Sequence, residues 1–241
     1  MDLSIIVPAY NEEGYLADCL GCVLADVQSS RAPGSIEVVV VDNASTDRTG
    51  EVAKSFPGVR VVNEPQKGLT RARQRGLSEA RGEIIAFIDA DTRMPPGWVT
   101  RVVAPFERDR RVVCVSGPYI YYDASKFERL LVRMYWLFLA EPTYWLTRYM
   151  VVGGNFAAKR SALIEIGGFD TAIAFYGEDT NIARRLSAAG KVKFMMSLPM
   201  YTSARRLHAE GLTVTALRYA VNFLAEVVLK RPVTDQYQDV R

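Results

Sequence analysis

The chain has 241 residues, a net charge of +3, an apolar fraction of 49% and a charged fraction of 24%. This length can bury the core of one large domain, and the composition is that of an ordinary globular protein. The charge is too small, and its basic residues too scattered, to indicate a nucleic-acid-binding protein.

The cysteine and histidine content excludes two common kinds of site. Three cysteines cannot form a disulfide framework, which is typical of a reducing cytoplasm. With one histidine, a zinc site built from cysteine and histidine is not expected. Residues 1–5 lack the basic start of a signal peptide, and no uncharged apolar stretch has the length of a membrane span. We therefore expect a cytoplasmic protein.

The first half of the sequence alternates short apolar runs with amphipathic segments. We predict strands at residues 3–8, 36–41, 59–62 and 83–88, and helices from residue 16 to 24 and from 69 to 80. This alternation predicts an α/β fold with a mainly parallel, doubly wound sheet flanked by helices. Polar clusters follow three of the strands, at residues 10–13, 42–43 and 89–91. Because ligands bind beyond the carboxyl ends of such strands, these clusters should meet at one edge.

The second half has a different pattern. A strand is predicted at residues 112–116, a long aromatic-rich stretch at 127–150, and tight turns at 153–155 and 167–170. A helix begins at Glu178 and Asp179 and ends before Gly190. A last helix, at 212–229, carries a polar stripe on an otherwise apolar surface: Arg218, Asn222, Glu226 and Lys230.

Asp89 and Asp91 are separated by one residue in an extended segment, so their side chains project to the same side. Two carboxylates this close repel each other unless a cation lies near them. Mg²⁺ or Mn²⁺ accepts such oxygen ligands and keeps positions open for phosphate oxygens. The pair therefore indicates a metal site that would neutralise a diphosphate leaving group.

Three other groups allow two interpretations each. Glu178 and Asp179 either complement the dipole at the start of a helix or supply a general base for an acceptor hydroxyl. The arginines of the helix at 69–80, Arg73 among them, form either a solvated face or an anion site. Lys67, in the loop before Gly68, either reaches an anion or has no ligand.

A series of motifs in fixed order resembles the family 2 glycosyltransferases, which are inverting enzymes of the GT-A fold. The match covers most of residues 1–190. The motifs are Val7-Pro8-Ala9-Tyr10-Asn11-Glu12-Glu13, Val41-Asp42-Asn43-Ala44-Ser45-Thr46-Asp47, Lys67-Gly68, Ala72-Arg73-Gln74, Asp89-Ala90-Asp91, Gly167-Gly168-Phe169-Asp170, Gly177-Glu178-Asp179 and Arg185-Leu186.

The resemblance implies transfer of a sugar from a UDP- or GDP-sugar donor to an acceptor hydroxyl, with Mn²⁺ or Mg²⁺. Residues 1–110 would form the nucleotide-sugar half and residues 111–241 the acceptor half of one continuous domain. Asp179 would be the catalytic base with Glu178 beside it, and Asp91, near Asp89, would bind the metal. The residues implied to bind the nucleotide sugar are Pro8, Ala9, Tyr10, Glu12, Asp42, Asn43, Lys67, Arg73, Asp89, Ala90, Gly153, Gly154 and Asn155.

The sequence departs from the family pattern in two places. Gln74 stands where the family often has asparagine, and Ser203 stands near the place of a histidine that ligates metal in many relatives. His208, a few residues later, either takes this role or lies on the surface. Arg205 and Arg206 either hold the diphosphate when a C-terminal loop closes or form an exposed basic pair.

The aromatic-rich stretch at 127–150 is interleaved with Arg129, Arg133 and Arg148. It predicts either helices beside an acceptor cleft or a surface that rests on the inner face of a membrane to reach a lipid-linked acceptor. The helix at 212–229 allows the same two interpretations and also a homodimer contact, because its wide apolar face requires a partner.

Two other functions stay open beside sugar transfer to a hydroxyl. A polyprenyl-phosphate sugar synthase would use a phosphate acceptor that needs little base catalysis. A catalytically inactive binding or scaffold protein would keep the fold alone, although the presence of Asp89, Asp91 and Asp179 together argues against it. A nucleotidyltransferase is not expected, since the first loop lacks the glycine-rich sequence that cradles a triphosphate.

Overall fold

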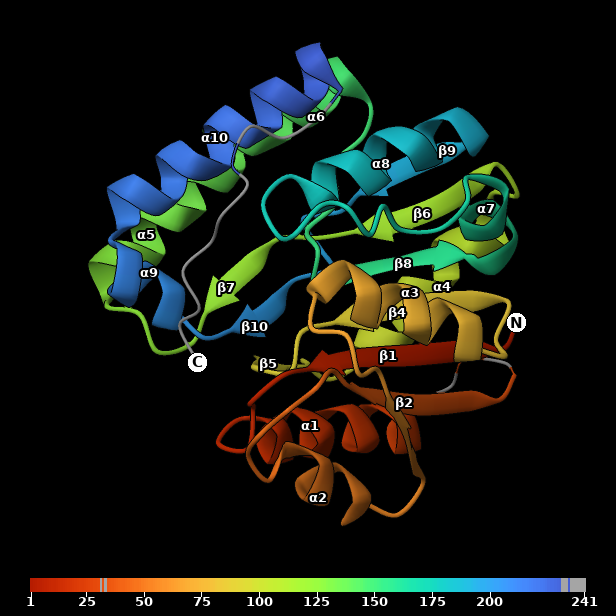
Figure 1. Cartoon of the computed structure of the whole chain (residues 1–241). Helices are drawn as coiled ribbons and strands as arrows, with labels where there is room; N and C mark the ends of the chain where they lie inside the picture. Colours follow the sequence, from red (N-terminus) through yellow and green to blue (C-terminus); the bar gives the residue numbers. More distant parts are fainter. Residues whose placement is uncertain (31, 33, 231–233, 235–241) are drawn as a thin grey trace.

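The computed structural model describes residues 1–30, 32, 34–230 and 234, and seven strands form its central sheet (Figure 1). The strand order is β3-β2-β1-β4-β8-β6-β9. Neighbouring strands are parallel except around β8, which is antiparallel to both β4 and β6. The predicted mainly parallel α/β sheet is thereby confirmed. The strands are β1 (Leu3–Ala9), β2 (Ile36–Asp42), β3 (Val59–Asn63), β4 (Ile84–Ile88), β6 (Val112–Ser116), β8 (Asn155–Lys159) and β9 (Lys191–Phe194).

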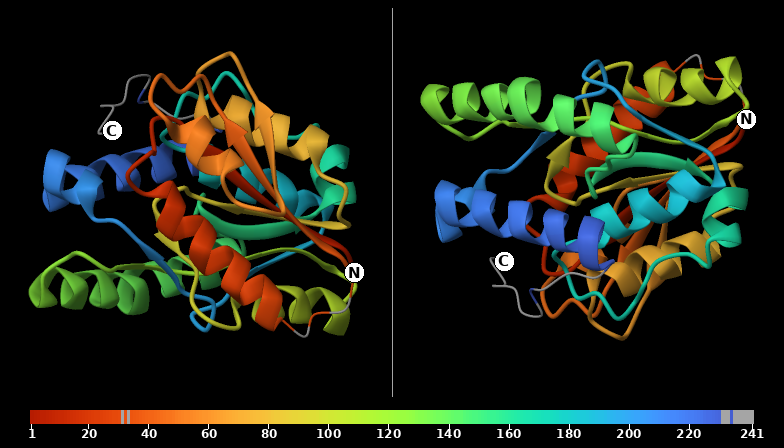
Figure 2. Two further views of the ribbon diagram at one scale, coloured as in Figure 1. Left: turned by 90° about the horizontal axis from the view of Figure 1, so that it is seen from below. Right: turned by 90° about the horizontal axis from the view of Figure 1, so that it is seen from above.

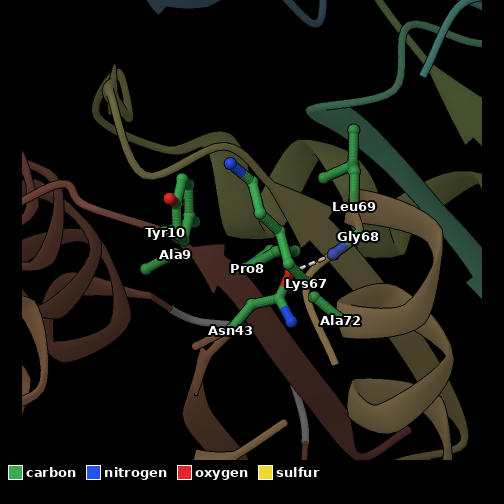
Figure 3. Close-up of a pocket in the computed structure, with 8 residues that line it drawn as sticks. All are labelled: Pro8, Ala9, Tyr10, Asn43, Lys67, Gly68, Leu69 and Ala72. Carbon is green, nitrogen blue, oxygen red and sulfur yellow. Dashed lines mark hydrogen bonds between the residues drawn. The ribbon is translucent and has the colours of Figure 1, made fainter. Parts of the chain in front are cut away.

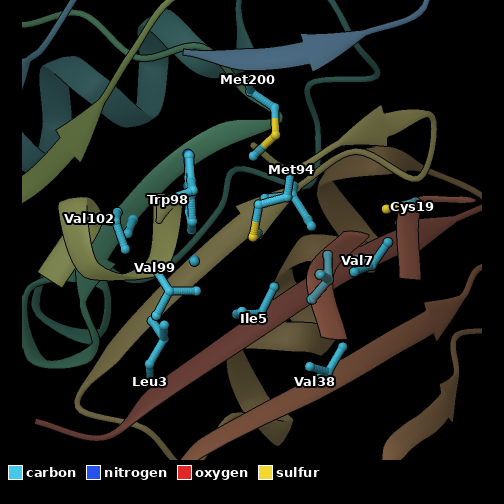
Figure 4. Close-up of a cluster of buried hydrophobic side chains, with 14 of the residues drawn as sticks. Leu3, Ile5, Val7, Cys19, Val38, Met94, Trp98, Val99, Val102 and Met200 are labelled. Atoms are coloured by element: carbon cyan, nitrogen blue, oxygen red, sulfur yellow. The ribbon is translucent and has the colours of Figure 1, made fainter. Parts of the chain in front are cut away.

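Helices cover both faces of this sheet, because successive side chains of each strand point to opposite faces. On one face Leu3, Ile5 and Val7 of β1 pack against α1, α2 and α4 (Figure 4). On the other face Ile6 packs with α3, α7 and α8. The helices are α1 (Leu16–Ser29), α2 (Thr49–Lys54), α3 (Leu69–Glu79), α4 (Trp98–Arg108), α7 (Arg160–Glu165) and α8 (Glu178–Ala189).

A second, smaller sheet extends the first one beyond its carboxyl edge. It consists of β5 (Thr92–Arg93), β10 (Met200–Thr202) and β7 (Tyr119–Tyr121), in the order β5-β10-β7. β5 directly follows Asp91, and β7 and β10 each lead into a helical segment. This sheet therefore connects the predicted metal-binding aspartates to the helices of the second half.

Two helical segments project from the body on the side of this small sheet and run roughly parallel to each other (Figure 2). The central arm comprises α5 (Lys126–Tyr135), the π-helical turn η1 (Trp136–Ala140) and α6 (Glu141–Thr147). The C-terminal arm comprises α9 (Arg205–Glu210) and α10 (Leu212–Leu229). In the part of the chain described, no helix has both the length and the hydropathy that crossing a bilayer requires.

Two of the four residues of the polar stripe predicted on the last helix face the protein, whereas Lys230 is exposed and the Arg218 side chain is 40% exposed. Asn222 and Glu226 are buried, at 1% and 0% exposure. Asn181 Nδ2 of α8 donates to Glu226 Oε1 at 3.0 Å, and Arg184 Nη2 donates to the same oxygen at 2.9 Å. The apolar side of α10 is consequently left at the surface, where Leu217 is 65% exposed.

Candidate active site

A pocket lies at the carboxyl ends of β1 and β2, beside the N-terminus of α3 (Figure 3). The Lys67 ammonium lies 3.9 Å from the centre of the Tyr10 ring. No side chain caps the N-terminus of α3, whose free N–H groups favour an anion. The pocket therefore suits a ligand with a flat ring and negative charge. Its lining combines five predicted residues with Gly68, Leu69 and Ala72, which were not predicted: Pro8, Ala9, Tyr10, Asn43, Lys67, Gly68, Leu69 and Ala72.

Asn43 builds this pocket through hydrogen bonds within the protein. Its Nδ2 donates to the carbonyl oxygens of Glu64 at 3.1 Å and Gln66 at 2.7 Å. Its Oδ1 accepts from the N–H of Gly68 at 2.8 Å. The side chain thus fixes the loop that carries Lys67 and leads into α3.

Asp42 lies outside the set of residues that line this pocket, although it ends the neighbouring strand β2. The residue is half-buried, and its Oδ1 accepts a hydrogen bond from the N–H of Ser45 at 3.2 Å. Recognition of the base by Asp42 therefore stays a prediction.

Arg73 is the centre of a buried ionic network. Its side chain is 1% exposed, whereas Arg71 and Arg75 of the same helix lie at the surface. Nη2 of Arg73 lies 3.2 Å from Asp89 Oδ1, and Nη1 lies 2.6 Å from Glu178 Oε1. The interpretation of the arginines as a solvated face is therefore wrong for Arg73. Its side chain connects Asp89 to Glu178 at the start of α8.

Tyr119 completes the surroundings of Asp89. Its hydroxyl donates to Asp89 Oδ2 at 2.8 Å, so each carboxylate oxygen of Asp89 has a partner within the protein. Tyr119 was not predicted as a site residue. No motif marks this residue, and the available signal was its position shortly after the strand predicted at 112–116.

The turn at Gly153 and Gly154 packs directly against this network. A Cβ atom at Gly153 would lie 2.5 Å from Glu178 Oε1, and one at Gly154 would lie 2.2 Å from Asp89 Cγ. Neither position has room for a side chain, which explains why the loop has glycine at both. Gly153 therefore lies beside the predicted catalytic residue Glu178, and Gly154 lies beside the predicted metal-binding residue Asp89.

Asn155 was predicted in the same turn but begins β8 and is fully buried. Its Oδ1 accepts from Trp98 Nε1 at 3.0 Å, and its Nδ2 donates to the carbonyl oxygen of Leu198 at 2.9 Å. This side chain ties α4 and the segment before β10 to the sheet. A direct contact of the Asn155 side chain with a ligand is thus not supported by its position.

Glu178 and Asp179, in the first turn of α8, have different surroundings. Burial raises the pKa of Glu178 to about 7, although the nearby Arg73 charge acts in the opposite direction. Burial also raises the pKa of Asp179, whose Oδ1 accepts from the N–H of Thr180 at 2.7 Å. Among the described residues none donates a hydrogen bond to Oδ2 of Asp179. Asp179 is half-buried and therefore the more accessible of the two to a substrate.

Asp91 is paired with Arg205 of the C-terminal arm. Nε of Arg205 lies 2.9 Å from Asp91 Oδ2, and Nη1 donates to Glu12 Oε2 at 2.9 Å. Ala90, between the two aspartates, is buried. Arg205 thus contacts two other predicted site residues, Glu12 and Asp91, which lie far from it in the sequence.

Arg206 points into a different cluster, with Nη1 3.0 Å from Glu210 Oε1 and its guanidinium 4.3 Å from the centre of the Phe175 ring. Both Arg205 and Arg206 side chains are 17% exposed. The interpretation of these arginines as an exposed basic pair is therefore wrong.

His208 is in contact with the central arm rather than with Asp89 and Asp91. Its Nε2 lies 3.8 Å from Glu128 Oε1 of the central arm, and its side chain is 51% exposed. Across the described residues, no group of three or more His, Cys, Asp or Glu side chains is arranged to hold a metal ion. A metal at this site would therefore need ligands beyond the protein, such as phosphate oxygens and water.

Comparisons with known proteins point to one family. The family model described as Glycosyl transferase family 2 matches residues 4–167. The probable glycosyltransferase YdaM of Bacillus subtilis is 28% identical over 205 residues, which cover 78% of this chain and 47% of YdaM. The uncharacterised glycosyltransferase EpsJ of the same organism is 31% identical over 134 residues, which cover 54% of this chain and 37% of EpsJ. The chain thus spans less than half the length of either relative.

Solved structures share the fold. A mannosyltransferase from Pyrobaculum calidifontis, PcManGT, in complex with GDP-Man and Mn²⁺, has a TM-score of 0.72 at 22% identity and covers 94% of this chain and 64% of its own. Glucosyl-3-phosphoglycerate synthase from Mycobacterium tuberculosis, in complex with Mn²⁺, UDP-Glc and phosphoglyceric acid, has a TM-score of 0.62 at 22% identity and covers 92% and 78%. The expected GT-A fold is thereby confirmed. Because the family model matches more than half of the sequence, the chain belongs to glycosyl transferase family 2.

Proposed function

We propose that this chain transfers a sugar from a nucleoside-diphosphate sugar to an acceptor hydroxyl, with inversion at the sugar carbon. The observation that carries the proposal is the continuous edge formed by the pocket at Tyr10 and Lys67, the Arg73–Asp89 pair and the first turn of α8. Along this edge a nucleotide, a diphosphate and a sugar would meet the groups that each requires.

The nucleotide would occupy the pocket beside Tyr10, with Lys67 and the N-terminus of α3 near its negative charge. Asp42 would contact the base from the end of β2. PcManGT is solved with GDP-Man and the mycobacterial synthase with UDP-Glc. Proteins of similar fold therefore bind nucleotide sugars whose base is either guanine or uracil. We therefore propose a UDP- or GDP-sugar as the donor.

Asp91 and Asp89 would hold a divalent cation, Mn²⁺ or Mg²⁺. The two carboxylates supply the oxygen ligands that such a cation accepts, and in the unliganded protein Arg205, at 2.9 Å, neutralises Asp91. When bound, the metal would neutralise the diphosphate as it leaves the sugar. Arg205, at the start of α9, would add positive charge beside it, whereas Arg206 is directed to Glu210. His208 is not included, since its ring faces Glu128.

Asp179 would accept the proton of the acceptor hydroxyl while that oxygen attacks the sugar carbon. Its raised pKa makes the carboxylate a stronger base than an exposed aspartate. Glu178, held 2.6 Å from Arg73, would keep the guanidinium in place beside Asp89. Gly153 and Gly154 would border the sugar, because their lack of side chains leaves the carboxylates approachable.

The proposal is tested by calorimetric titration of UDP and GDP, with and without Mn²⁺, into the wild-type protein, Asp91→Asn and Asp109→Asn. Asp109, in the loop between α4 and β6, is a control aspartate at the other end of the sheet. We expect metal-dependent binding of one nucleotide that Asp91→Asn abolishes and Asp109→Asn preserves. If neither nucleotide binds the wild type with any metal, the donor site is wrong and a scaffold role gains support.

A polyprenyl phosphate is a second candidate acceptor, favoured by the apolar side chains that both arms expose. A phosphate acceptor is already an anion and needs little help from a base. Asp179→Asn would then change the rate little, whereas a hydroxyl acceptor should lose about a hundredfold or more. Rates measured with both kinds of acceptor would separate the two candidates.

A further inference from the structure

The two arms expose large apolar side chains that the rest of the described protein does not cover. On the central arm, Leu146 is 86% exposed, Phe138 69% and Phe127 68%, and on α10 Leu217 is 65% exposed. Both arms stand on the same side of the molecule and run roughly parallel (Figure 2). Apolar patches of more than a few hundred Å² are rare on soluble monomers and mark interaction surfaces.

The C-terminal arm presents this apolar face because its polar residues hold it to the body. Glu226 is bound by Asn181 and Arg184 of α8, and Arg218 Nη1 lies 2.9 Å from Glu210 Oε2. The orientation of α10 is therefore fixed by ion pairs with α8 and α9. Rotation of the helix to bury its apolar side would break these buried contacts, each of which is costly to lose.

The exposed charges of the central arm are positive. Its surface cations are Lys126, Arg129, Arg133 and Arg148. Its two acidic residues are Glu128, which closes a capping box with Ser125, and Glu141, and both are half-buried. The Arg148 guanidinium also lies 5.2 Å from the centre of the Trp145 ring, an aromatic and basic pair of the kind found at membrane interfaces.

We propose that the two arms seat this protein on an anionic lipid bilayer. Apolar side chains would enter the region between headgroups and acyl chains, while the arginines contact lipid phosphates. A symmetric contact between two copies is less favourable, because it would bring the same cations of both central arms together. The bilayer offers both a negative surface and an apolar interior, which together match the composition of the arms.

This placement also assigns a class of acceptor, a step that rests on the proposed transferase function. Both arms are attached to elements of the proposed site. Asn181 of α8, two residues after Asp179, donates to Glu226 of α10 at 3.0 Å. Trp136 Nε1 of the central arm donates to the carbonyl oxygen of Tyr119, whose hydroxyl donates to Asp89. The proposed site thus lies beside both arms. An acceptor whose lipid chain remains in the bilayer would present its hydroxyl or phosphate between them.

Flotation with phospholipid vesicles tests the docking directly. The wild-type protein is mixed with vesicles of phosphatidylcholine alone or of phosphatidylcholine with phosphatidylglycerol, at low and high salt. We expect it to float with the anionic vesicles and to be released by salt. Phe138→Asp should weaken this binding about tenfold or more, as expected for the loss of one large inserted side chain. Ile164→Asp on α7, where the side chain is 56% exposed, is the control and should bind like the wild type.

The electrostatic part is tested by the double variant Arg129→Gln/Arg133→Gln. With about 1 kcal/mol for each surface arginine, we expect about 30-fold weaker binding to anionic vesicles. Arg108→Gln/Arg110→Gln removes two exposed arginines at the opposite end of the sheet and should leave binding unchanged. Equal loss in both double variants would overturn the assigned surface, because attraction would then depend only on net charge.

If the wild-type protein does not float with anionic vesicles at low salt, the proposal that the arms dock on a bilayer is wrong. Light scattering then shows whether a second copy takes its place: a dimer that Phe138→Asp dissociates would assign these faces to self-association. Calorimetric binding of UDP or GDP is measured on the same variants. A variant that binds nucleotide but not vesicles separates loss of docking from misfolding, and a wild type that floats but binds no nucleotide would refute the donor site alone.

Discussion

Arg205 Nε lies 2.9 Å from Asp91 Oδ2, although the two residues come from the C-terminal arm and from the loop between β4 and β5. The same guanidinium forms a bidentate contact with Glu12, which is 2% exposed. A positive charge thus occupies the position beside Asp91 where the proposed metal would bind. Arg205 and the metal would therefore compete for the same carboxylate until the diphosphate arrives.

Replacement of Arg205 by glutamine should accordingly strengthen the binding of Mn²⁺ in the absence of nucleotide. We expect about a tenfold lower Kd for the ion, because a nearby positive charge is removed. Arg206→Gln is the matched control, since Arg206 is paired with Glu210 and should not affect Asp91. Calorimetric titration of Mn²⁺ measures both. An unchanged Kd in Arg205→Gln would mean that the arginine and the metal do not share the site.

Tyr119 should position Asp89 for the donor without contributing to the chemistry. Tyr119→Phe removes the 2.8 Å hydrogen bond to Asp89 Oδ2 and keeps the ring. A hydrogen bond to a charged group contributes about 1.5–3 kcal/mol, so we expect donor binding to weaken about tenfold or more. Tyr201→Phe, on β10, is the control because its side chain is 38% exposed. If Tyr119→Phe changes the melting temperature but not the Kd of the donor, the tyrosine has a structural role only.

The stability of the unliganded protein should fall as the pH rises from about 5 to 7, because of Glu178. Burial raises the pKa of this carboxyl group from 4.5 in the unfolded chain to about 7 in the folded one. Over that interval the folded state keeps a proton that the unfolded state has lost, so each rise in pH favours unfolding. The expected loss is up to about 3 kcal/mol.

Glu178→Gln should remove this pH dependence, because glutamine keeps the shape of the neutral carboxyl group and does not titrate. Urea unfolding of both proteins at several pH values from 4 to 8 gives the comparison. Below pH 4.5 the two should differ by an amount that is independent of pH. Parallel stability curves across the whole range would show that Glu178 is ionised in the folded protein throughout, held so by Arg73 at 2.6 Å.

The strands of the first half and the edge that carries the site could be predicted from the sequence because both depend on local pattern. Continuous apolar runs such as Ile36–Asp42 and the polar residues after them are enough to place a parallel strand and its carboxyl end. The start of α8 at Glu178 was also predicted, since acidic residues in the first turn complement the helix dipole.

Contacts between distant segments could not be predicted in this way. Tyr119 meets Asp89, and Asn155 meets Trp98, through tertiary packing that leaves no periodic signal in the sequence. The antiparallel direction of β8 within a mainly parallel sheet likewise leaves no periodic signal in the sequence. Helix α4 is a different case, because Val99, Val102, Val103 and Phe106 have the spacing of a buried helix face and the pattern was overlooked.

The polar stripe of α10 was predicted, but the sequence pattern did not determine which face of the helix turns toward the protein. A helix with one polar and one apolar face normally turns the apolar face inward. Here Glu226 is fully buried because Asn181 and Arg184 supply its partners, and neither could be assigned to it from sequence spacing. The orientation of the arm, and with it the exposed apolar surface, therefore depends on tertiary ion pairs.

The two glycines Gly154 and Gly21 should respond to the same substitution in opposite directions. At Gly154 a Cβ atom would lie 2.0 Å from the Tyr119 hydroxyl and 2.2 Å from Asp89 Cγ. We expect Gly154→Ala to destabilise the fold by about 2 kcal/mol and to displace Asp89 from the donor. At Gly21, inside α1, nothing lies within 4 Å of the added atom, and alanine should stabilise the helix by about 1 kcal/mol.

Urea unfolding gives both changes in stability, and calorimetry gives donor affinity for the same two proteins. Gly21→Ala should bind the donor like the wild type, because Gly21 is exposed and the added methyl group would contact nothing within 4 Å. A Gly154→Ala variant with normal stability and normal affinity would contradict the close packing of this turn on Asp89. Normal stability with lost affinity would instead mean that the turn yields to the methyl group by moving Asp89, which would still place Gly154 at the donor site.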